Sequence, residues 1–166
     1  MGNKIIITYD QAHFKIDADI RKCWYPIGKT PIVYKNGSKK AINIGGAYTS
    51  TKEFHFYRME TQNKKEVLNN LKMLRLKYPN MFLLLDKAPW NKNKTIIKFL
   101  KHHNIEHMFF PTGASDLNAT EFCWKITRDN KTANTSHNSE EELYQELKSY
   151  WKTQPFNHNL LNYLEP

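Results

Sequence analysis

The sequence has little cysteine and no long apolar run, and both shortages narrow the classes of protein it can belong to. Its 166 residues include two cysteines, Cys23 and Cys123, which lie far apart and form no CxxC pair. This argues against a disulfide framework and against a zinc site built on thiolates, and it indicates a reducing, cytoplasmic compartment. No window approaches the roughly 18 consecutive apolar residues of a transmembrane helix, so we expect no membrane partner.

What the chain has in excess is positive charge. It carries 25 Lys and Arg against 16 Asp and Glu, a formal net charge of +9. A soluble protein with a lysine-rich surface has this balance, and so does a protein that binds a polyanion, above all nucleic acid. The length and the 40 % hydrophobic content indicate one soluble domain with a sizeable core.

The order of the predicted elements indicates an α/β fold. Apolar and β-branched runs predict strands over 4–9, 41–48, 53–60, 81–85 and 105–110, and an irregular strand containing a turn over 24–35. Asn36-Gly37 is the dipeptide favoured in type I′ hairpins, and Gly45-Gly46 indicates a bulge or a close backbone approach. Helical spacing predicts helices over 64–78, 93–103, 120–127 and 139–153.

This order corresponds to three antiparallel strands followed by helix, strand, helix, strand and helix, which predicts a mixed sheet with right-handed crossovers. We expect one domain over 1–166, with a core over 1–135 and a C-terminal helical appendage over 136–166. The last helix opens with a capping box of Ser139 and Glu142. Its apolar face packs on its own domain or on a dimer partner, and the sequence leaves both open.

The run Met81–Leu85 ends on an acid, Asp86. A short uninterrupted apolar run predicts a strand buried on both faces, at the centre of the sheet. A carboxylate at the C-terminal tip of such a strand lies where open α/β sheets usually place their chemistry. The simpler interpretation is that Asp86 caps the next turn.

Two further acids occupy matching positions. Asp10 follows the first predicted strand, and Glu121 lies in the first turn of the helix after the strand 105–110. If the strands 4–9 and 81–85 are neighbours, Asp10 and Asp86 emerge side by side and Glu121 closes the site. Such a trio repels itself unless a cation is bound, and its oxygen-only ligands favour Mg²⁺ or Mn²⁺. Two such ions support in-line attack on a phosphodiester, so the acids predict nucleic-acid cleavage in a basic protein.

Glu121 also has a structural interpretation. With Asn118 as the cap residue, it occupies the third helical position of a capping box. At helical spacing, Glu121 shares a predicted exposed face with Trp124, Lys125 and Arg128, while Phe122, Cys123 and Ile126 point toward the core. This face fits a metal ligand flanked by phosphate contacts, and it equally fits a solvated ion-pair face.

Several segments together resemble the catalytic domain of DDE transposases of the mariner superfamily, in its prokaryotic insertion-sequence branch. The first are Asp10–Phe14 (DQAHF) and Arg21–Pro31 (RKCWYPIGKTP), which is similar to the family's R-x-x-W-x-P-x-G-x-x-P segment. The LLLD strand ending at Asp86 follows, and then LNATE with Trp124, similar to L-N-P-x-E-x-x-W. Between Asp86 and Glu121 lie 34 residues (87–120), a gap common in the superfamily.

The resemblance implies a ribonuclease H-like mixed five-stranded sheet flanked by helices, with Asp10, Asp86 and Glu121 as catalytic and metal-binding triad. It further implies Mg²⁺ or Mn²⁺ in a two-metal site, cleavage and strand transfer of double-stranded DNA at transposon ends and target, and a homodimer. Such an enzyme would act in the cytoplasm, at the nucleoid of a prokaryote.

The chain departs from the family pattern at four positions around the acids. Gln11 stands where many members have Glu, Lys87 and Asn91 replace the Asn and His of D-N-x-x-x-H, and Ala119 replaces the Pro of N-P-x-E. Because neighbouring residues orient metal ligands, these changes predict weakened activity. Two alternatives follow: a catalytically decayed DNA-binding or dimerising remnant, and a ribonuclease H-type nuclease acting on RNA–DNA hybrids.

Only nine residues precede Asp10, whereas family members carry helix-turn-helix domains before that position. We therefore expect the catalytic part alone, without sequence-specific recognition of transposon ends. The remaining DNA affinity is expected to be non-specific and to fall with salt. The residues predicted to contact DNA are Lys35, Lys39, Lys40, Lys92, Lys94, Lys125 and Arg128.

Overall fold

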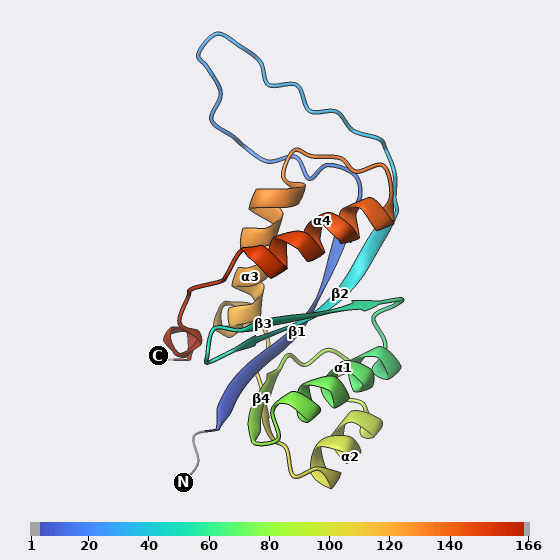
Figure 1. The fold of residues 1–166 in the computed structure, drawn as a ribbon, viewed down its shortest axis with the longest axis vertical. Coiled ribbons are helices and arrows are strands. Elements are labelled where there is room, and N and C mark those ends of the chain that lie inside the picture. Colours follow the sequence, from blue (N-terminus) through green and yellow to red (C-terminus); the bar gives the residue numbers. More distant parts are fainter. Residues whose placement is uncertain (1–3, 165–166) are drawn as a thin grey trace.

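A mixed β-sheet runs through the centre of the molecule in the computed structural model, which describes residues 4–164 (Figure 1). The strands lie in the order β3-β2-β1-β4-β5. β1 pairs antiparallel with β2 and parallel with β4, and Tyr9 lies opposite Leu85. The predicted mixed sheet is therefore confirmed, including the neighbouring first and fourth strands. The strands are β1 (Ile5–Lys15), β2 (Ala41–Thr49), β3 (Phe54–Met59), β4 (Met81–Leu85) and β5 (Glu106–Phe109).

Helices cover both faces of the sheet and agree closely with the predicted ranges. One face packs against α1 (Lys64–Lys77) and α2 (Lys94–His102), the other against α3 (Ala119–Thr127) and α4 (Glu140–Thr153). Each helix begins at a residue whose side chain accepts a hydrogen bond from the first turn, and these N-caps are Asn63, Asn93, Asn118 and Ser139. Among residues 4–164, none of these helices combines the length and apolar character needed to cross a membrane.

Alternation along β1 decides which layer each of its side chains enters. Ile7 and Tyr9 lie in the core under α1 and α2, whereas Ala12 and Phe14 lie in the core under α3 and α4. Since successive residues of a strand face opposite sides of a sheet, Asp10 points toward α3.

Three details of the sequence prediction are wrong. β1 continues through Lys15 because residues as far as Lys15 pair with β2, so Asp10 lies inside the strand and not at its end. Residues 24–35 form no strand; Pro26 and Pro31 lack the N–H that a ladder needs. Asn36-Gly37 is not a type I′ turn, which requires positive φ at both residues, because only Gly37 has positive φ, +69°.

Residues 20–35 instead form an extended arm, which projects from the end of the molecule beyond β1 and β2 (Figure 1). Every residue from 21 to 30 is exposed, including the tryptophan and the proline of the family-like segment that fall in this range.

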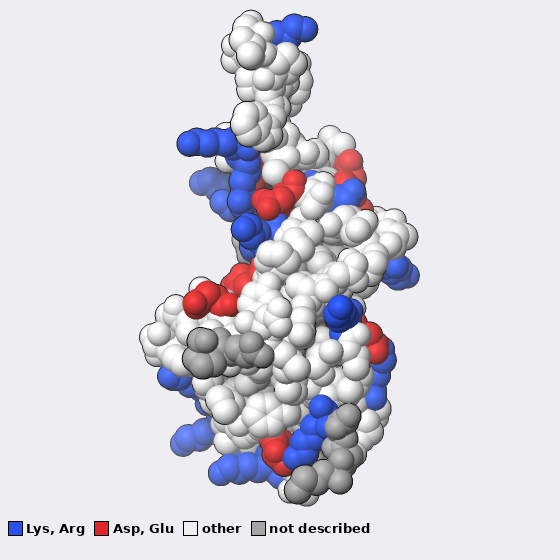
Figure 2. All heavy atoms as spheres, turned by 90° about the vertical axis from the view of Figure 1, so that its left-hand side faces the viewer, with Lys and Arg blue, Asp and Glu red and all other residues white. Residues whose placement is uncertain are grey.

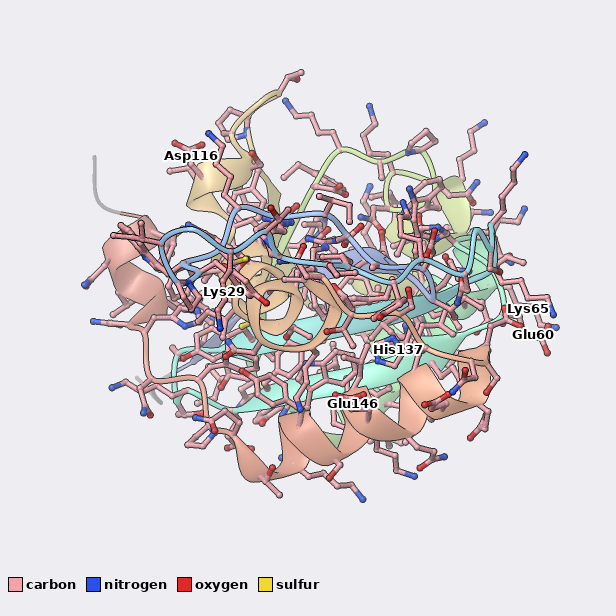
Figure 3. The ribbon with its side chains drawn as sticks, turned by 90° about the horizontal axis from the view of Figure 1, so that it is seen from above. Lys29, Glu60, Lys65, Asp116, His137 and Glu146 are labelled. Atoms are coloured by element: carbon pink, nitrogen blue, oxygen red, sulfur yellow. The ribbon has the colours of Figure 1, made fainter. Side chains whose placement is uncertain are left out.

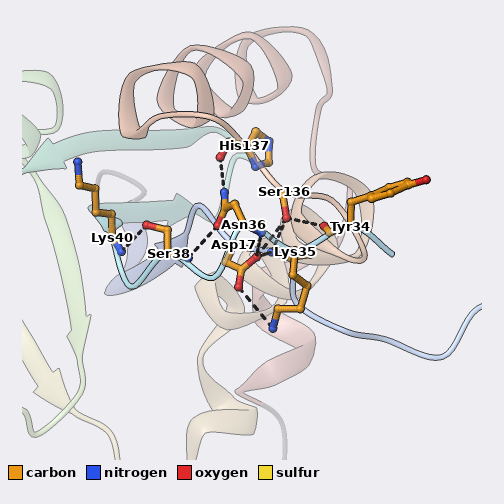
Figure 4. A network of polar contacts seen from close by, with 9 residues as sticks. Asp17, Tyr34, Lys35, Asn36, Ser38, Lys40, Ser136 and His137 are labelled. Carbon is orange, nitrogen blue, oxygen red and sulfur yellow. Dashed lines mark hydrogen bonds and ion pairs between the residues drawn. The ribbon is translucent and has the colours of Figure 1, made fainter. Parts of the chain in front are cut away.

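The base of the arm is fastened by Asp17, a buried carboxylate just beyond the end of β1 (Figure 4). Its Oδ1 accepts hydrogen bonds from the Asn36 backbone N–H at 3.0 Å and from Ser136 Oγ at 3.2 Å. Lys35 Nζ lies 3.4 Å from its Oδ2, and the Asn36 side chain donates to the His137 carbonyl at 2.7 Å. Both ends of the arm are thus tied to the segment that precedes α4.

We expect Asp17→Ala to lower the midpoint of thermal unfolding by several degrees at pH 7, because its donors lose their acceptor. Burial alone would raise the pKa of Asp17, but its hydrogen bonds and Lys35 hold that pKa below the ordinary value. The stabilisation is therefore present above the unfolded-state pKa and is lost as pH falls through the folded-state pKa. Melting curves at pH 7 and pH 3 check this: the difference from wild type should shrink at pH 3. The exposed Asp116→Ala serves as control.

The last helix packs on its own domain, which decides between the two alternatives for its apolar face. Leu143, Leu147 and Trp151 lie in the core shared by α3 and the sheet, and Trp151 Nε1 donates to Thr127 Oγ1 at 2.9 Å. Seen from above, the side chains of His137 and Glu146 lie together at α4, with Nε2 and Oε2 2.9 Å apart (Figure 3). The division into a core over 1–135 and an appendage over 136–166 stays a prediction, and residues 165–166 lie outside the described range.

Candidate active site

The three predicted acids line a single pocket of about 250 Å³. Asp10 comes from the middle of β1, Asp86 from the residue after β4, and Glu121 from the first turn of α3. The loop between β5 and α3 completes the wall with residues 110–115. Strand pairing brings the two aspartates to one side of the sheet, so residues remote in sequence reach one cavity.

Asp10 is a buried acid, with 5 % of its surface exposed. Its Oδ2 accepts a hydrogen bond from Trp124 Nε1 at 3.1 Å. Burial first, and then the negative charges of Glu121 and Asp86, raise the pKa of Asp10 to about 8. The pocket is thus arranged around a carboxyl group that is costly to ionise unless positive charge is bound beside it.

Trp124 corrects the predicted helix face. Helical spacing predicts an exposed position on α3, but the side chain is 1 % exposed and lies in the core. Gly46 makes room for it: a Cβ on Gly46 would lie 2.3 Å from Trp124 Cη2. The predicted close approach at Gly45-Gly46 is confirmed, and the glycine lets the indole reach Asp10, which lies opposite Gly46 in the sheet.

Asp86 is held by the turn that follows it. Its Oδ1 accepts from the Ala88 backbone N–H at 3.1 Å and from the side chain of Asn91. The turn-capping interpretation is therefore correct as far as it goes, while the same carboxylate still lines the pocket.

Glu121 is placed by its neighbours on α3. Asn118 caps the helix through Thr120 N, but the Asn118 N–H donates to the Ser115 carbonyl, so the reciprocal half of a capping box is missing. Thr120 Oγ1 lies 2.7 Å from Thr8 Oγ1 and 2.8 Å from the Thr8 carbonyl, which docks the first turn of α3 on β1. Glu121 thus contributes to the pocket and not to the cap.

The donor chemistry of the pocket fits a hard divalent cation. All three side chains offer carboxylate oxygens, and within residues 4–164 none of them is paired with a basic side chain. The same part of the chain holds no set of three His, Cys, Asp or Glu side chains already converged on one point. The carboxylates share a cavity, so side-chain rotation would have to bring them together around an ion.

The predicted DNA-contacting residues come from three separate segments of the chain. Lys35, Lys39 and Lys40 lie on the returning end of the arm and just after it, Lys92 and Lys94 at the start of α2, and Lys125 and Arg128 on or just after α3. Two of the seven already have intramolecular partners: Lys35 pairs with Asp17, and the guanidinium of Arg128 lies 5.2 Å from the centre of the Phe14 ring. On the face shown in Figure 2, Lys and Arg side chains stand around the outline of the molecule. Lys125 lies closest in sequence to Glu121 and lines a shallow hollow beside it.

Comparison with known families shows which protein family the chain belongs to. A sequence-family model described as DDE superfamily endonuclease matches residues 6–144. The chain belongs to this family. The match includes all three acids and stretches from β1 into α4, so the DDE domain takes up most of the chain. No curated protein matches the chain in sequence.

Solved structures with the same fold as this DDE domain include several of Mos1 transposase. A pre-cleavage Mos1 transpososome matches with a TM-score of 0.71 and 15 % identity, over 90 % of this chain and 48 % of that one. A Mos1 mariner paired-end complex with Mn gives 0.67 and 17 %, over 95 % and 50 %, and the Mos1 catalytic domain gives 0.65 and 14 %, over 96 % and 74 %. The chain spans about half the length of the Mos1 chains in these DNA complexes. The ribonuclease H-like transposase fold predicted from the sequence is confirmed.

Proposed function

We propose that this DDE domain is the catalytic part of a transposase, which cleaves DNA strands and transfers them during transposition. The observation that carries the proposal is the convergence of Asp10, Asp86 and Glu121, from three separate segments, on one pocket in a DDE-family fold.

In this proposal the three carboxylates hold Mg²⁺ or Mn²⁺. Two ions held there would supply the Lewis acidity for in-line attack on a phosphodiester. The protein positions the segments that carry the ligands: Trp124 holds Asp10 from the core, and Thr120 seats the first turn of α3, which carries Glu121, over β1. Because Asp10 is buried between two other acids, a cation that neutralises the trio should bind more tightly than to exposed carboxylates.

The proposed substrate is double-stranded DNA, at transposon ends and target. The net charge of +9 supports a polyanionic partner, with exposed lysines on the arm and at α2 contacting phosphates without sequence preference. The Mos1 paired-end complexes support a dimeric assembly on DNA. We place the protein in the cytoplasm of a prokaryote, at the nucleoid.

Calorimetric Mn²⁺ titration and plasmid nicking, carried out in parallel, test this proposal. We expect wild type to bind Mn²⁺ and nick supercoiled DNA, and Asp86→Asn to lose both, because the substitution removes one ligand charge without changing the shape of the side chain. Asn130→Asp, an exposed position after α3, adds a carboxylate away from the pocket and should leave both unchanged.

Nicking that persists in Asp86→Asn would refute the assignment. Salt-sensitive DNA binding without cleavage in either metal would identify a decayed remnant. Preferential cutting of an RNA–DNA hybrid would identify a ribonuclease H-type nuclease.

A further inference from the structure

Three side chains that do not line the pocket, Trp90, Gln11 and Asn91, form a continuous chain of hydrogen bonds that ends on Asp86. Trp90 Nε1 donates to Gln11 Oε1 at 2.7 Å, and Gln11 Nε2 donates to Asn91 Oδ1 at 3.2 Å. Asn91 Nδ2 in turn donates to Asp86 Oδ1. We call this chain, from Trp90 through Gln11 and Asn91 to Asp86, the amide relay.

The amide relay has one direction. Each carboxamide accepts a hydrogen bond on its oxygen and donates one from its nitrogen, so every N–H points toward Asp86. Trp90 can only donate, which fixes the orientation of Gln11, and Gln11 fixes the orientation of Asn91. Asn91 is fully buried, so an amide turned the wrong way would leave polar atoms unpaired without access to water. The orientation of Asp86 is therefore decided from Trp90 onward.

Two of these residues lie at positions where the chain departs from its family pattern, Gln11 and Asn91. Taken singly, each departure weakens the expected support of Asp86. In the structure the two substituted residues bond to each other and rebuild that support with neutral groups. Gln11 follows Asp10 in β1, so the relay also joins the strand that carries one acid to the turn that carries another.

We propose that Trp90, Gln11 and Asn91 are positioning residues that hold Asp86 for divalent-metal binding through the amide relay. The inference rests on the proposed metal site but concerns residues outside the pocket lining. Partners of this kind typically change metal affinity by about 10- to 100-fold when they are removed.

The decisive variant is Gln11→Glu, because the added charge alone and the amide relay predict opposite changes in Mn²⁺ affinity. An added carboxylate near a cation site should tighten Mn²⁺ binding through charge alone. In the relay, the introduced carboxylate can still accept from Trp90 but cannot donate to Asn91, so Asn91 turns and presents its oxygen to Asp86. We therefore expect Mn²⁺ affinity, measured by calorimetry, to fall about 10-fold or more.

Asn43→Asp is the matched control. It makes the same amide-to-carboxylate change on β2 and also loses one donated hydrogen bond, to the Glu60 carbonyl at 3.2 Å. We expect wild-type Mn²⁺ affinity in this variant. Unchanged or tighter binding in Gln11→Glu would overturn the proposal.

A second measurement does not depend on metal. In Asn91→Leu, Gln11 loses the partner that holds its amide, so the indole N–H resonance of Trp90 should move in a ¹H–¹⁵N spectrum. The resonances of exposed Trp24 and of Trp151, which donates to Thr127, should stay in place. An unmoved Trp90 resonance would refute a continuous relay. If wild type binds no Mn²⁺ while Trp90 responds as expected, the relay stands and the proposed metal site fails.

Discussion

Asp10→Asn is expected to stabilise the metal-free protein while removing its Mn²⁺ affinity and its nicking activity. Asparagine can still accept the Trp124 hydrogen bond but carries no charge into a site that is 5 % exposed and faces two other acids. Since the pKa of Asp10 is raised to about 8 in the folded state, folding at neutral pH must either take up a proton at this acid or bury its charge, and both oppose folding. The gain in the free energy of unfolding at pH 8 should amount to several kcal/mol, because each unit of pKa shift corresponds to about 1.4 kcal/mol.

The raised pKa of Asp10 also predicts how stability changes with pH. The folded protein binds more protons at Asp10 than the unfolded chain between the ordinary pKa of 3.8 and about 8, so this residue makes stability fall as pH rises through that window. Melting in EDTA at pH 5 and pH 8 should show the fall in wild type and a smaller fall in Asp10→Asn. Mn²⁺ should restore wild type alone. A variant that melts lower than wild type at pH 8 in EDTA would contradict the prediction, and the exposed Asp116→Asn controls for charge.

Gly46→Ala is expected to damage both the fold and the site. The new methyl group would lie 2.3–2.4 Å from two carbons of the Trp124 ring, which is itself packed against the rings of Phe14, Phe54 and Trp151. Overpacking of this kind costs about 1–3 kcal/mol, and the displaced indole no longer reaches Asp10. Chemical denaturation should show the loss of stability, and Mn²⁺ titration a weaker site.

Gly45→Ala is the matched control, because the two glycines are adjacent but face opposite layers. A Cβ on Gly45 would lie 2.3 Å from Asn70 Nδ2 and 2.8 Å from the Tyr9 hydroxyl, under α1 and away from Trp124. It should lose comparable stability but weaken Mn²⁺ binding less than Gly46→Ala, because it leaves the hydrogen bond from Trp124 to Asp10 intact although Gly45 lies opposite Gln11 in the ladder. Equal loss of affinity in both variants would mean that the site responds to general destabilisation and not to Trp124.

The sequence predicted the helices and most of the sheet because apolar periodicity is a local property. Val67, Leu71 and Leu74 repeat at helical spacing, and all are buried under the sheet in α1. Composition predicts a strand in the arm because its Tyr, Ile and Val are typical of strands. Strands also need a partner, and Asp17, Ser136 and His137 instead tie the ends of this segment to a distant loop.

The acids could be found in the sequence because strand order brings Asp10 and Asp86 together, and the structure places both beside Glu121. The residues that support these acids could not be found in the sequence, because their contacts join a strand of the sheet to a helix or turn that is remote along the chain. Spacing on α3 alone predicts an exposed Trp124, and only the missing side chain of Gly46 allows it to be buried. In the sequence, Gln11 and Asn91 each predict weaker support of Asp86, and only the structure shows that they form a hydrogen bond with each other.

Adjacent residues of β1 serve opposite layers: the carboxylate of Asp10 enters the pocket and the carboxamide of Gln11 enters the relay. A slip of one residue along the ladder with β2 would bring Gln11 into the pocket in place of Asp10 in one direction, and would put Asp10 beside Trp90 and Asn91 in place of Gln11 in the other. Insertion or deletion of a single residue between Ile5 and Tyr9 should therefore abolish Mn²⁺ binding and DNA nicking even where the chain still folds. Length, as well as identity, is under chemical constraint in this strand.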